Sequence, residues 1–139
     1  MKGKTNLAVS KHGVLRANSG FPYFPSPRFS PGDSRRAAVI DVLDPRIHFA
    51  PNCTSNSCPS IGVYIPDMID QQLDLAARSF INADTVLDLK KSEISISRIF
   101  SWYVVDFGGK AGILQSLEKY LVLPERTYQY QATLSNLAL

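Results

Sequence analysis

The sequence predicts one mixed α/β (α+β) domain, in which three or more helices pack on a small sheet of short strands. Apolar residues recur at helical spacing in residues 69–80 and 111–121, and short alternating runs typical of strands lie between them. A chain of 139 residues has room for one domain. Hydrophobic residues make up 45% of the chain and charged residues 19%, which provides enough apolar surface for a core.

The front of the chain differs in composition from the rest. Residues 1–17 are predicted to be the N-terminal segment of the domain, residues 18–34 a loop, residues 35–123 the main α/β body and residues 124–139 a frayed tail. The loop holds four prolines and four aromatic residues without any strand or helix period. Its segment SPGD, residues 30–33, is typical of a turn. We expect the aromatic side chains to pin the loop onto the domain surface or to meet a partner.

The main body begins with a short apolar run at residues 36–43, and two segments of strand composition follow at residues 46–50 and 61–65. A helix is then predicted from the spacing of Ile69 and the apolar residues up to Phe80. Asp67 is expected to cap its start, and Asn82 to mark its end.

The second half of the body is predicted as a hairpin and two helices. Residues 85–89 and 93–96 both alternate and flank a polar tip. Ser97 is expected to cap a short helix that closes at residues 106–109, and the last helix follows it. Trp102 and Tyr103 are interpreted as core residues of the short helix.

Charge and targeting signals limit the expected partners. Residues 1–50 hold eight Lys/Arg and three Asp/Glu, but these basic residues are scattered, so nucleic-acid binding is not expected. The sequence has no secretory signal and no apolar run long enough to span a bilayer, so we expect a cytoplasmic protein that meets no membrane. Two cysteines are too few for a disulfide framework in a chain of this size. The expected cytoplasmic location also predicts that both thiols are reduced. A protein is the expected partner.

Four side chains form the whole His and Cys stock of the chain: His12, His48, Cys53 and Cys58. A structural zinc site would use all four, although the ligand spacing is not that of a zinc finger. A redox dithiol normally has two residues between its cysteines, whereas four separate them here. A buried thiol beside a hydrogen-bonded histidine also needs no chemical function.

A nucleophilic cysteine is the remaining alternative. In this interpretation Cys53 attacks, His48 or His12 acts as the base, and Asp44 or Asp106 orients the imidazole. Separately, Arg46 could clamp a carboxylate or phosphate, or pair with an internal acid such as Asp44 or Asp106.

Several blocks of the sequence resemble one known family. They are HGVLR with Asn18 at residues 12–18, DPRIHFA at 44–50, NC at 52–53, SCP at 57–59, and ISISRIF-x-WY-x-x-DFG at 94–108. In this order they resemble the signature of the domain-of-unknown-function 547 family, over about residues 10–121. The resemblance implies a fold and a set of marked residues, but no settled reaction.

The chain departs from the family pattern at several positions. Ala17 replaces a glycine, Thr54 replaces a glycine, and Pro51 replaces a leucine just before Cys53, where it would interrupt strand pairing. An aromatic- and Asn-rich helix block that usually opens the domain is missing, so we expect the chain to be the back portion of the domain.

The sequence therefore predicts a non-catalytic protein-interaction or scaffold domain that needs no cofactor and no metal. The alternatives are a cysteine-dependent hydrolase or acyl transferase, and a zinc-binding module. The candidate catalytic residues are Cys53, His48, His12 and Asp44, and the candidate binding residues are Arg46, Cys58, Arg16 and Asp106.

Overall fold

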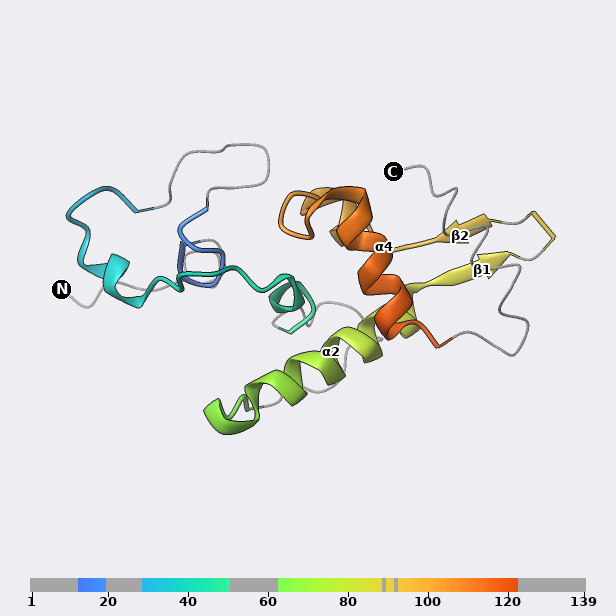
Figure 1. The fold of residues 1–139 in the computed structure, drawn as a ribbon, viewed down its shortest axis with the longest axis horizontal. Coiled ribbons are helices and arrows are strands. Elements are labelled where there is room, and N and C mark those ends of the chain that lie inside the picture. Colours follow the sequence, from blue (N-terminus) through green and yellow to red (C-terminus); the bar gives the residue numbers. More distant parts are fainter. Residues whose placement is uncertain (1–12, 20–28, 51–62, 89, 92, 123–139) are drawn as a thin grey trace. The chain divides into compact units, whose positions relative to one another are not determined.

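The computed structural model of the chain describes residues 13–19, 29–50, 63–88, 90–91 and 93–122 (Figure 1). The chain forms two compact units, Met1–Pro45 and Arg46–Leu139. The described residues contain three α-helices and a two-stranded antiparallel sheet, which confirms the predicted mixed α/β class.

The first unit is organised around Asn18 and Phe29. The side-chain amide of Asn18 donates to the Phe29 carbonyl (3.1 Å) and accepts from the Phe29 N–H (2.7 Å). The Phe29 ring is buried, and a Cβ atom added at Gly13 would lie 2.2 Å from it. Phe29 therefore packs inside its own unit and does not face a partner, whereas the other aromatic residues of the predicted loop lie outside the described residues.

Backbone conformation explains two sequence features of this unit. The predicted turn at residues 30–33 is confirmed, because the Asp33 N–H donates to the Ser30 carbonyl (3.1 Å) and Gly32 has a φ of 89°. Asp33 then caps the 3-10 helix η2 (Ser34–Ala38). Ala17 has a φ of 50°, a conformation that glycine adopts most readily, which accounts for glycine at this position in the resembled family.

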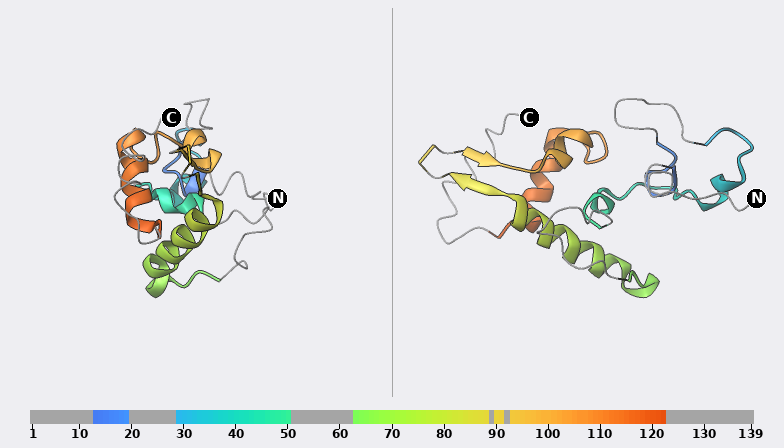
Figure 2. Two further views of the ribbon diagram at one scale, coloured as in Figure 1. Left: turned by 90° about the vertical axis from the view of Figure 1, so that its right-hand side faces the viewer. Right: turned by 180° about the vertical axis from the view of Figure 1, so that it is seen from behind.

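The second unit carries most of the regular structure (Figure 2). Its elements in chain order are η3 (Pro45–His48, starting one residue before the unit), η4 (Pro66–Met68), α2 (Ile69–Asp84), β1 (Val86–Asp88), β2 (Glu93–Ser95), α3 (Arg98–Trp102) and α4 (Gly109–Tyr120).

The core of this unit lies where α2 and α4 pack together with the α3 region. Apolar residues of α2 recur at helical spacing, so one face of the helix is buried and the other is exposed. The aromatic rings of Phe49, Phe100 and Phe107 contact one another at centroid distances of 4.9 to 5.7 Å. The buried cluster consists of Phe49, Ala77, Ile81, Ile99, Phe100, Phe107, Ile113, Leu117 and Tyr120.

The hairpin and the cap of α3 are confirmed. Strands β1 and β2 pair antiparallel with Leu87 opposite Ile94, and the Asp88 carboxylate accepts from the N–H groups of the tip at residues 90 and 91. The Ser97 hydroxyl oxygen accepts from the Ile99 N–H at the start of α3. Trp102 at the end of α3 is 46% exposed, so its interpretation as a core residue is wrong.

Both strands predicted before α2 are wrong where the structure describes them. Residues 45–48 form the 3-10 helix η3, because Pro45 fixes φ at its first position. Residues 63–65 join no ladder, although Ile65 is extended; the Gln72 amide accepts from the Ile65 N–H (2.8 Å) and donates to the Val63 carbonyl (3.0 Å). A side chain thus takes the place of a partner strand.

The predicted helix is confirmed, but its start is different. Asp67 does not cap it: η4 precedes α2, and Met68 occupies the N-cap without a side-chain hydrogen bond. The helix continues to Asp84, two residues past Asn82. Asn82 instead donates to the Tyr120 carbonyl and accepts from the Val122 N–H, so it fastens the end of α4 to α2.

Candidate functional site

His48 is the centre of a candidate site whose geometry the described residues show in detail. Its Nε2 atom lies 2.9 Å from Oδ2 of Asp106, and the side chains are 0% and 6% exposed. The sequence separates the two residues by 58 positions; η3 supplies the histidine, and the turn between α3 and α4 supplies the carboxylate. The structure therefore brings together two of the residues that the sequence marked.

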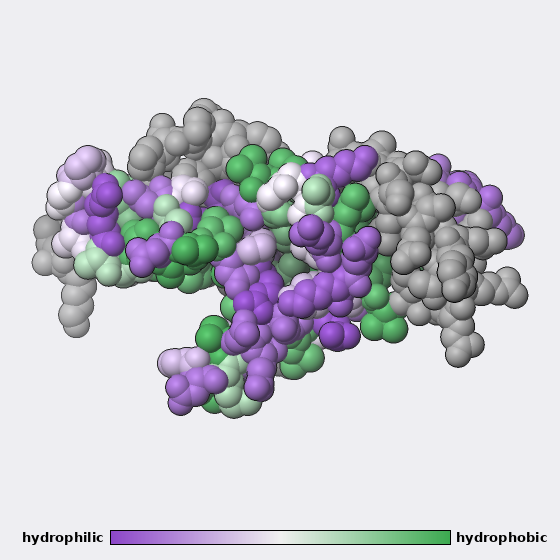
Figure 3. Space-filling view, viewed as in Figure 1, coloured by the Kyte–Doolittle hydropathy of each residue, from purple (hydrophilic) through white to green (hydrophobic). Residues whose placement is uncertain are grey.

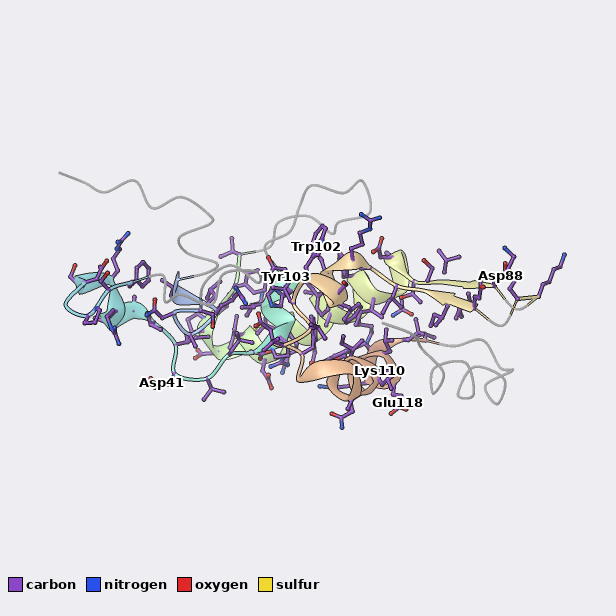
Figure 4. The ribbon with its side chains drawn as sticks, turned by 90° about the horizontal axis from the view of Figure 1, so that it is seen from above. Asp41, Asp88, Trp102, Tyr103, Lys110 and Glu118 are labelled. Carbon is purple, nitrogen blue, oxygen red and sulfur yellow. The ribbon has the colours of Figure 1, made fainter. Side chains whose placement is uncertain are left out.

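Aromatic rings enclose the imidazole. The Tyr103 ring stacks on the His48 ring at 3.9 Å between centroids and 21° between planes, and the Phe107 ring lies at 5.7 Å. Tyr103 also anchors the turn, because its carbonyl accepts from the N–H groups of Asp106 (2.9 Å) and Phe107 (3.2 Å). Figure 4 shows Tyr103 beside Trp102, where α3 ends. The sequence pattern predicted Tyr103 only as a core residue and gave no signal for its stacking on His48.

The pair has a definite chemical consequence. A carboxylate that accepts from Nε2–H fixes the tautomer, so that the lone pair of a neutral imidazole lies on Nδ1. A carboxylate orients a catalytic base by the same hydrogen bond. A buried hydrogen bond of this kind can equally serve only to hold two segments of the chain together. Of the two predicted orienters, Asp106 is the one with a described bond to His48.

Arg46 is held by two acids of α2. Its guanidinium bridges Asp70 (2.5 Å) and Asp74 (2.8 Å). Arg46 thus pairs with acids of its own chain, as one interpretation of the sequence predicted, but these ion pairs are with Asp70 and Asp74 and not with the predicted Asp44 or Asp106. Asp70 and Asp74 are four residues apart and share one side of α2, which was the available signal.

The Asp74 carboxylate accepts hydrogen bonds from three side chains. Besides Arg46 it accepts from the Tyr120 hydroxyl and from Nζ of Lys119 (3.2 Å). The Tyr120 hydrogen bond, followed by that of Arg46, lowers the pKa of Asp74 to about 2. Hydrogen bonds to Tyr120 and Asp74 also raise the pKa of Lys119. The network joins η3, α2 and α4.

One contact brings together the two residues that flank the cysteine-bearing segment. The hydroxyl of Tyr64 donates to the carbonyl of Ala50 at 3.4 Å. Ala50 and Tyr64 lie on either side of residues 51–62 in the sequence.

The remaining predicted site residues are placed as follows. Arg16 is buried and Asp44 is partly buried, both in the first unit. His12, Cys53 and Cys58 lie outside the described residues, so the proposed nucleophile, the second base and the redox pair stay predictions. Within the described ranges no group of three or more His, Cys, Asp or Glu side chains could hold a metal ion.

No helix in the described ranges is both long and apolar enough to cross a bilayer. Neither the curated proteins nor the solved structures include a match to this chain. A family model described as "Protein of unknown function, DUF547" matches residues 2–81. The match includes the segment with Arg46 and His48 and ends before the block at residues 94–108, which carries Asp106. Because it covers more than half of the 139 residues, the chain belongs to the DUF547 family of proteins of unknown function.

Proposed function

We propose that the chain is a non-catalytic protein-interaction or scaffold domain, which works in the cytoplasm with both thiols reduced. One observation carries the proposal: the His48 side chain is 0% exposed and is enclosed by Asp106 and Tyr103. A general base must come within hydrogen-bond reach of the proton that it removes. An imidazole in the core is better suited to holding η3 against the turn at residues 103–108.

The energetics of burial support the same role. Asp106 is almost as buried as His48, and a buried polar pair is stable only when its hydrogen bonds are made. The pair therefore adds a directional bond between η3 and the turn at residues 103–108, which the packing of Phe49 on Phe107 also brings together. A scaffold domain needs such rigid loops to present a surface.

A second candidate is a cysteine-dependent hydrolase or acyl transferase. The hydrogen bond between His48 and Asp106 favours it, because the same geometry orients the base in nucleophilic catalysis. In this candidate the imidazole takes the thiol proton as Cys53 attacks the acyl carbon, and Asp106 stabilises the imidazolium. The bond to the leaving group then breaks, the imidazolium gives it the proton, and the acyl group stays on Cys53 as a thioester until water or an acceptor takes it. Catalysis would then require His48 to become accessible.

The alkylation rates of Cys53 and Cys58 in the folded protein distinguish the two candidates. Rates would be measured from pH 4 to pH 10 with residue-level detection by mass spectrometry, since the thiolate is the species that reacts. The scaffold role predicts that neither thiol has a midpoint well below the ordinary value of about 8.5. The enzyme predicts one fast thiol, Cys53, with a clearly lower midpoint.

Three variants make the comparison specific. In the enzyme, His48→Gln and Asp106→Asn return the Cys53 midpoint to the ordinary range, whereas Asp88→Asn, a matched change in the hairpin, does not. In the scaffold, none of the three alters the midpoint as long as circular dichroism shows a folded chain. A low Cys53 midpoint that depends on His48 would refute the scaffold proposal, and Cys58 is the internal reference.

A further inference from the structure

Strand β1 has one edge that no described strand pairs. In the part of the chain that the structure describes, the sheet has two strands, and β1 pairs with β2 alone. An open edge presents a row of backbone N–H and C=O groups, and proteins normally pair or cover such an edge. In Figures 1 and 2 the hairpin extends away from α2 and α4, so these helices do not cover its outer part.

The two faces of the hairpin differ, and the difference determines what kind of strand could extend the sheet. Leu87 of β1 stands opposite Ile94 of β2; both are half-buried, and Ile94 packs against the core cluster. The other face carries the exposed pair of Val86 and Ser95. A strand that extends this sheet therefore needs apolar side chains at every second position and polar side chains between them.

The chain contains such a run after α4, at residues 127–134, which lie outside the described residues. Even-numbered positions are apolar or aromatic and odd-numbered positions are polar: Tyr128, Tyr130, Ala132 and Leu134 alternate with Thr127, Gln129, Gln131 and Thr133. The run has no charge, no proline and no glycine, and tyrosine and threonine favour strands. A terminal position predicts fraying unless the segment is tied down in a sheet. The alternation therefore favours a strand over a frayed tail.

The place where the chain leaves α4 indicates which strand the run can reach. The Val122 N–H donates to Oδ1 of Asn82 (2.8 Å), near the end of α2, and β1 begins at Val86. Val122 is 66% exposed, and in Figure 3 hydrophobic surface lies beside this end of α4, whereas the rest of the helix is mostly hydrophilic. The chain thus leaves its last described residue beside the segment that leads into β1.

The length of the connection sets the direction of the run. Residues 123–126 separate Val122 from it and, when extended, span at most about 14 Å. A strand of three residues, such as β1, is about 10 Å long. The connection can therefore follow β1 towards the tip of the hairpin, and the run then returns along β1. In the parallel direction the same connection would carry the run past the tip, where β1 has ended.

We propose that residues 127–134 form a third strand, antiparallel to β1 on the edge away from β2, with Tyr128 and Tyr130 on the face of Leu87. This strand extends the apolar face of the hairpin and closes the edge of β1. The proposal goes beyond the proposed function, because a catalytic and a non-catalytic chain would have the same strand. It also means that a partner of the scaffold domain does not bind by adding a strand to β1.

Hydrogen exchange of the full chain, detected by mass spectrometry of its peptides, tests whether the run is ordered. Amides of residues 127–134 are expected to exchange about tenfold or more slowly than in an unstructured peptide of the same sequence, because ladder hydrogen bonds protect them. Tyr130→Lys should abolish this protection, since it would place a charge on the apolar face. Gln129→Lys, on the polar face, is the matched control and should keep it. Unprotected exchange in the wild-type chain, or equal effects of the two variants, would overturn the proposal.

Disulfide cross-linking identifies the edge. Val86→Cys is combined in turn with a cysteine at each of three polar positions of the run, by Gln129→Cys, Gln131→Cys or Thr133→Cys. One of these pairs is expected to link within the same chain on mild oxidation, because neighbouring strands bring opposite Cα atoms within the reach of a disulfide.

The matched control uses the strand on the other side of β1. Ser95 stands opposite Val86, so Ser95→Cys combined with the same three changes should not link, since two strand spacings of about 10 Å separate the positions. Mass spectrometry of the peptides separates these bonds from any that involve the native cysteines. The absence of any link to Val86→Cys, links to Ser95→Cys instead, or links only between two copies of the chain would each overturn the proposal.

Discussion

At the scale of single residues, His48 shows that a sequence can identify a candidate residue without predicting which side chains surround it in the fold. The sequence marked His48 as a candidate base because the chain has two imidazoles, and Asp106 as one of two acids that could orient it. It left open whether Asp44 or Asp106 orients the imidazole. The choice depends on a contact between residues 58 positions apart, which no local pattern encodes.

The buried pair predicts an unusual result when its members are replaced. Asp106→Leu alone should lower the free energy of unfolding by about 3 kcal/mol, because it leaves Nε2 of a buried imidazole without its acceptor. The double variant His48→Phe with Asp106→Leu should lose clearly less, since both polar groups are gone and the stacking on Tyr103 is kept. Urea unfolding of the single and double variants measures this. Equal losses of unfolding free energy in the single and double variants would mean that the His48–Asp106 hydrogen bond does not contribute to stability.

At the scale of elements, the sequence predicted helices better than strands. The buried side of α2 and the hairpin were predictable because their apolar residues follow the helical and the alternating period. The segments at 46–50 and 63–65 had strand composition, but composition does not provide a partner strand. Pro45 starts the 3-10 helix η3 in the first segment. In the second segment the Gln72 side chain makes the backbone hydrogen bonds that a partner strand would make.

Helix α4 depends on a glycine at its second turn. A Cβ atom at Gly112 would lie 1.6 Å from the Phe107 carbonyl oxygen, which is backbone and cannot rotate away. Glycine normally costs a helix about 1 kcal/mol relative to alanine. Gly112→Ala should nevertheless destabilise the protein, by roughly 2 kcal/mol, because the turn that carries Asp106 must shift.

The control for this prediction is Ala111→Gly, at an exposed position one residue earlier. It should cost only the ordinary helix penalty of about 1 kcal/mol. Thermal unfolding followed by circular dichroism measures both variants. If Gly112→Ala raised the melting temperature, the close approach of α4 to the turn would not exist in solution.

At the scale of the whole molecule, each of the two units is held together by side chains that bind backbone groups or charged side chains far away in the sequence. Asn18 does this in the first unit, and Asn82 and Asp74 do it in the second. None of these long-range bonds follows from a local pattern, so the sequence could predict the elements but not what joins them. Arg46, one of the positions that the sequence marked as chemical, takes part in the network of the second unit.

The charge network around Asp74 makes the stability of the second unit depend on pH. The pKa of Asp74 is about 2 in the folded chain, against an ordinary value of 3.8, because Tyr120 and Arg46 donate to the carboxylate. A lowered pKa stabilises the folded state above pH 3.8, and this contribution is lost as the pH falls from about 4 to about 2. Asp74→Asn should therefore cost roughly 1 kcal/mol at pH 7, allowing for the solvent screening of a side chain that is 40% exposed.

Urea unfolding at intervals from pH 7 to pH 2 measures this dependence. The difference between the wild-type chain and Asp74→Asn should be constant above pH 4 and should shrink towards zero near pH 2. Asp33→Asn is the matched control, because Arg35 likewise lowers the pKa of Asp33 to about 2, but that pair is local and lies in the first unit. It should leave the transition of the second unit unchanged. If the wild-type and Asp74→Asn curves ran parallel down to pH 2, Asp74 would not be the carboxylate that joins η3, α2 and α4, and Arg46 would have to be held by Asp70 alone.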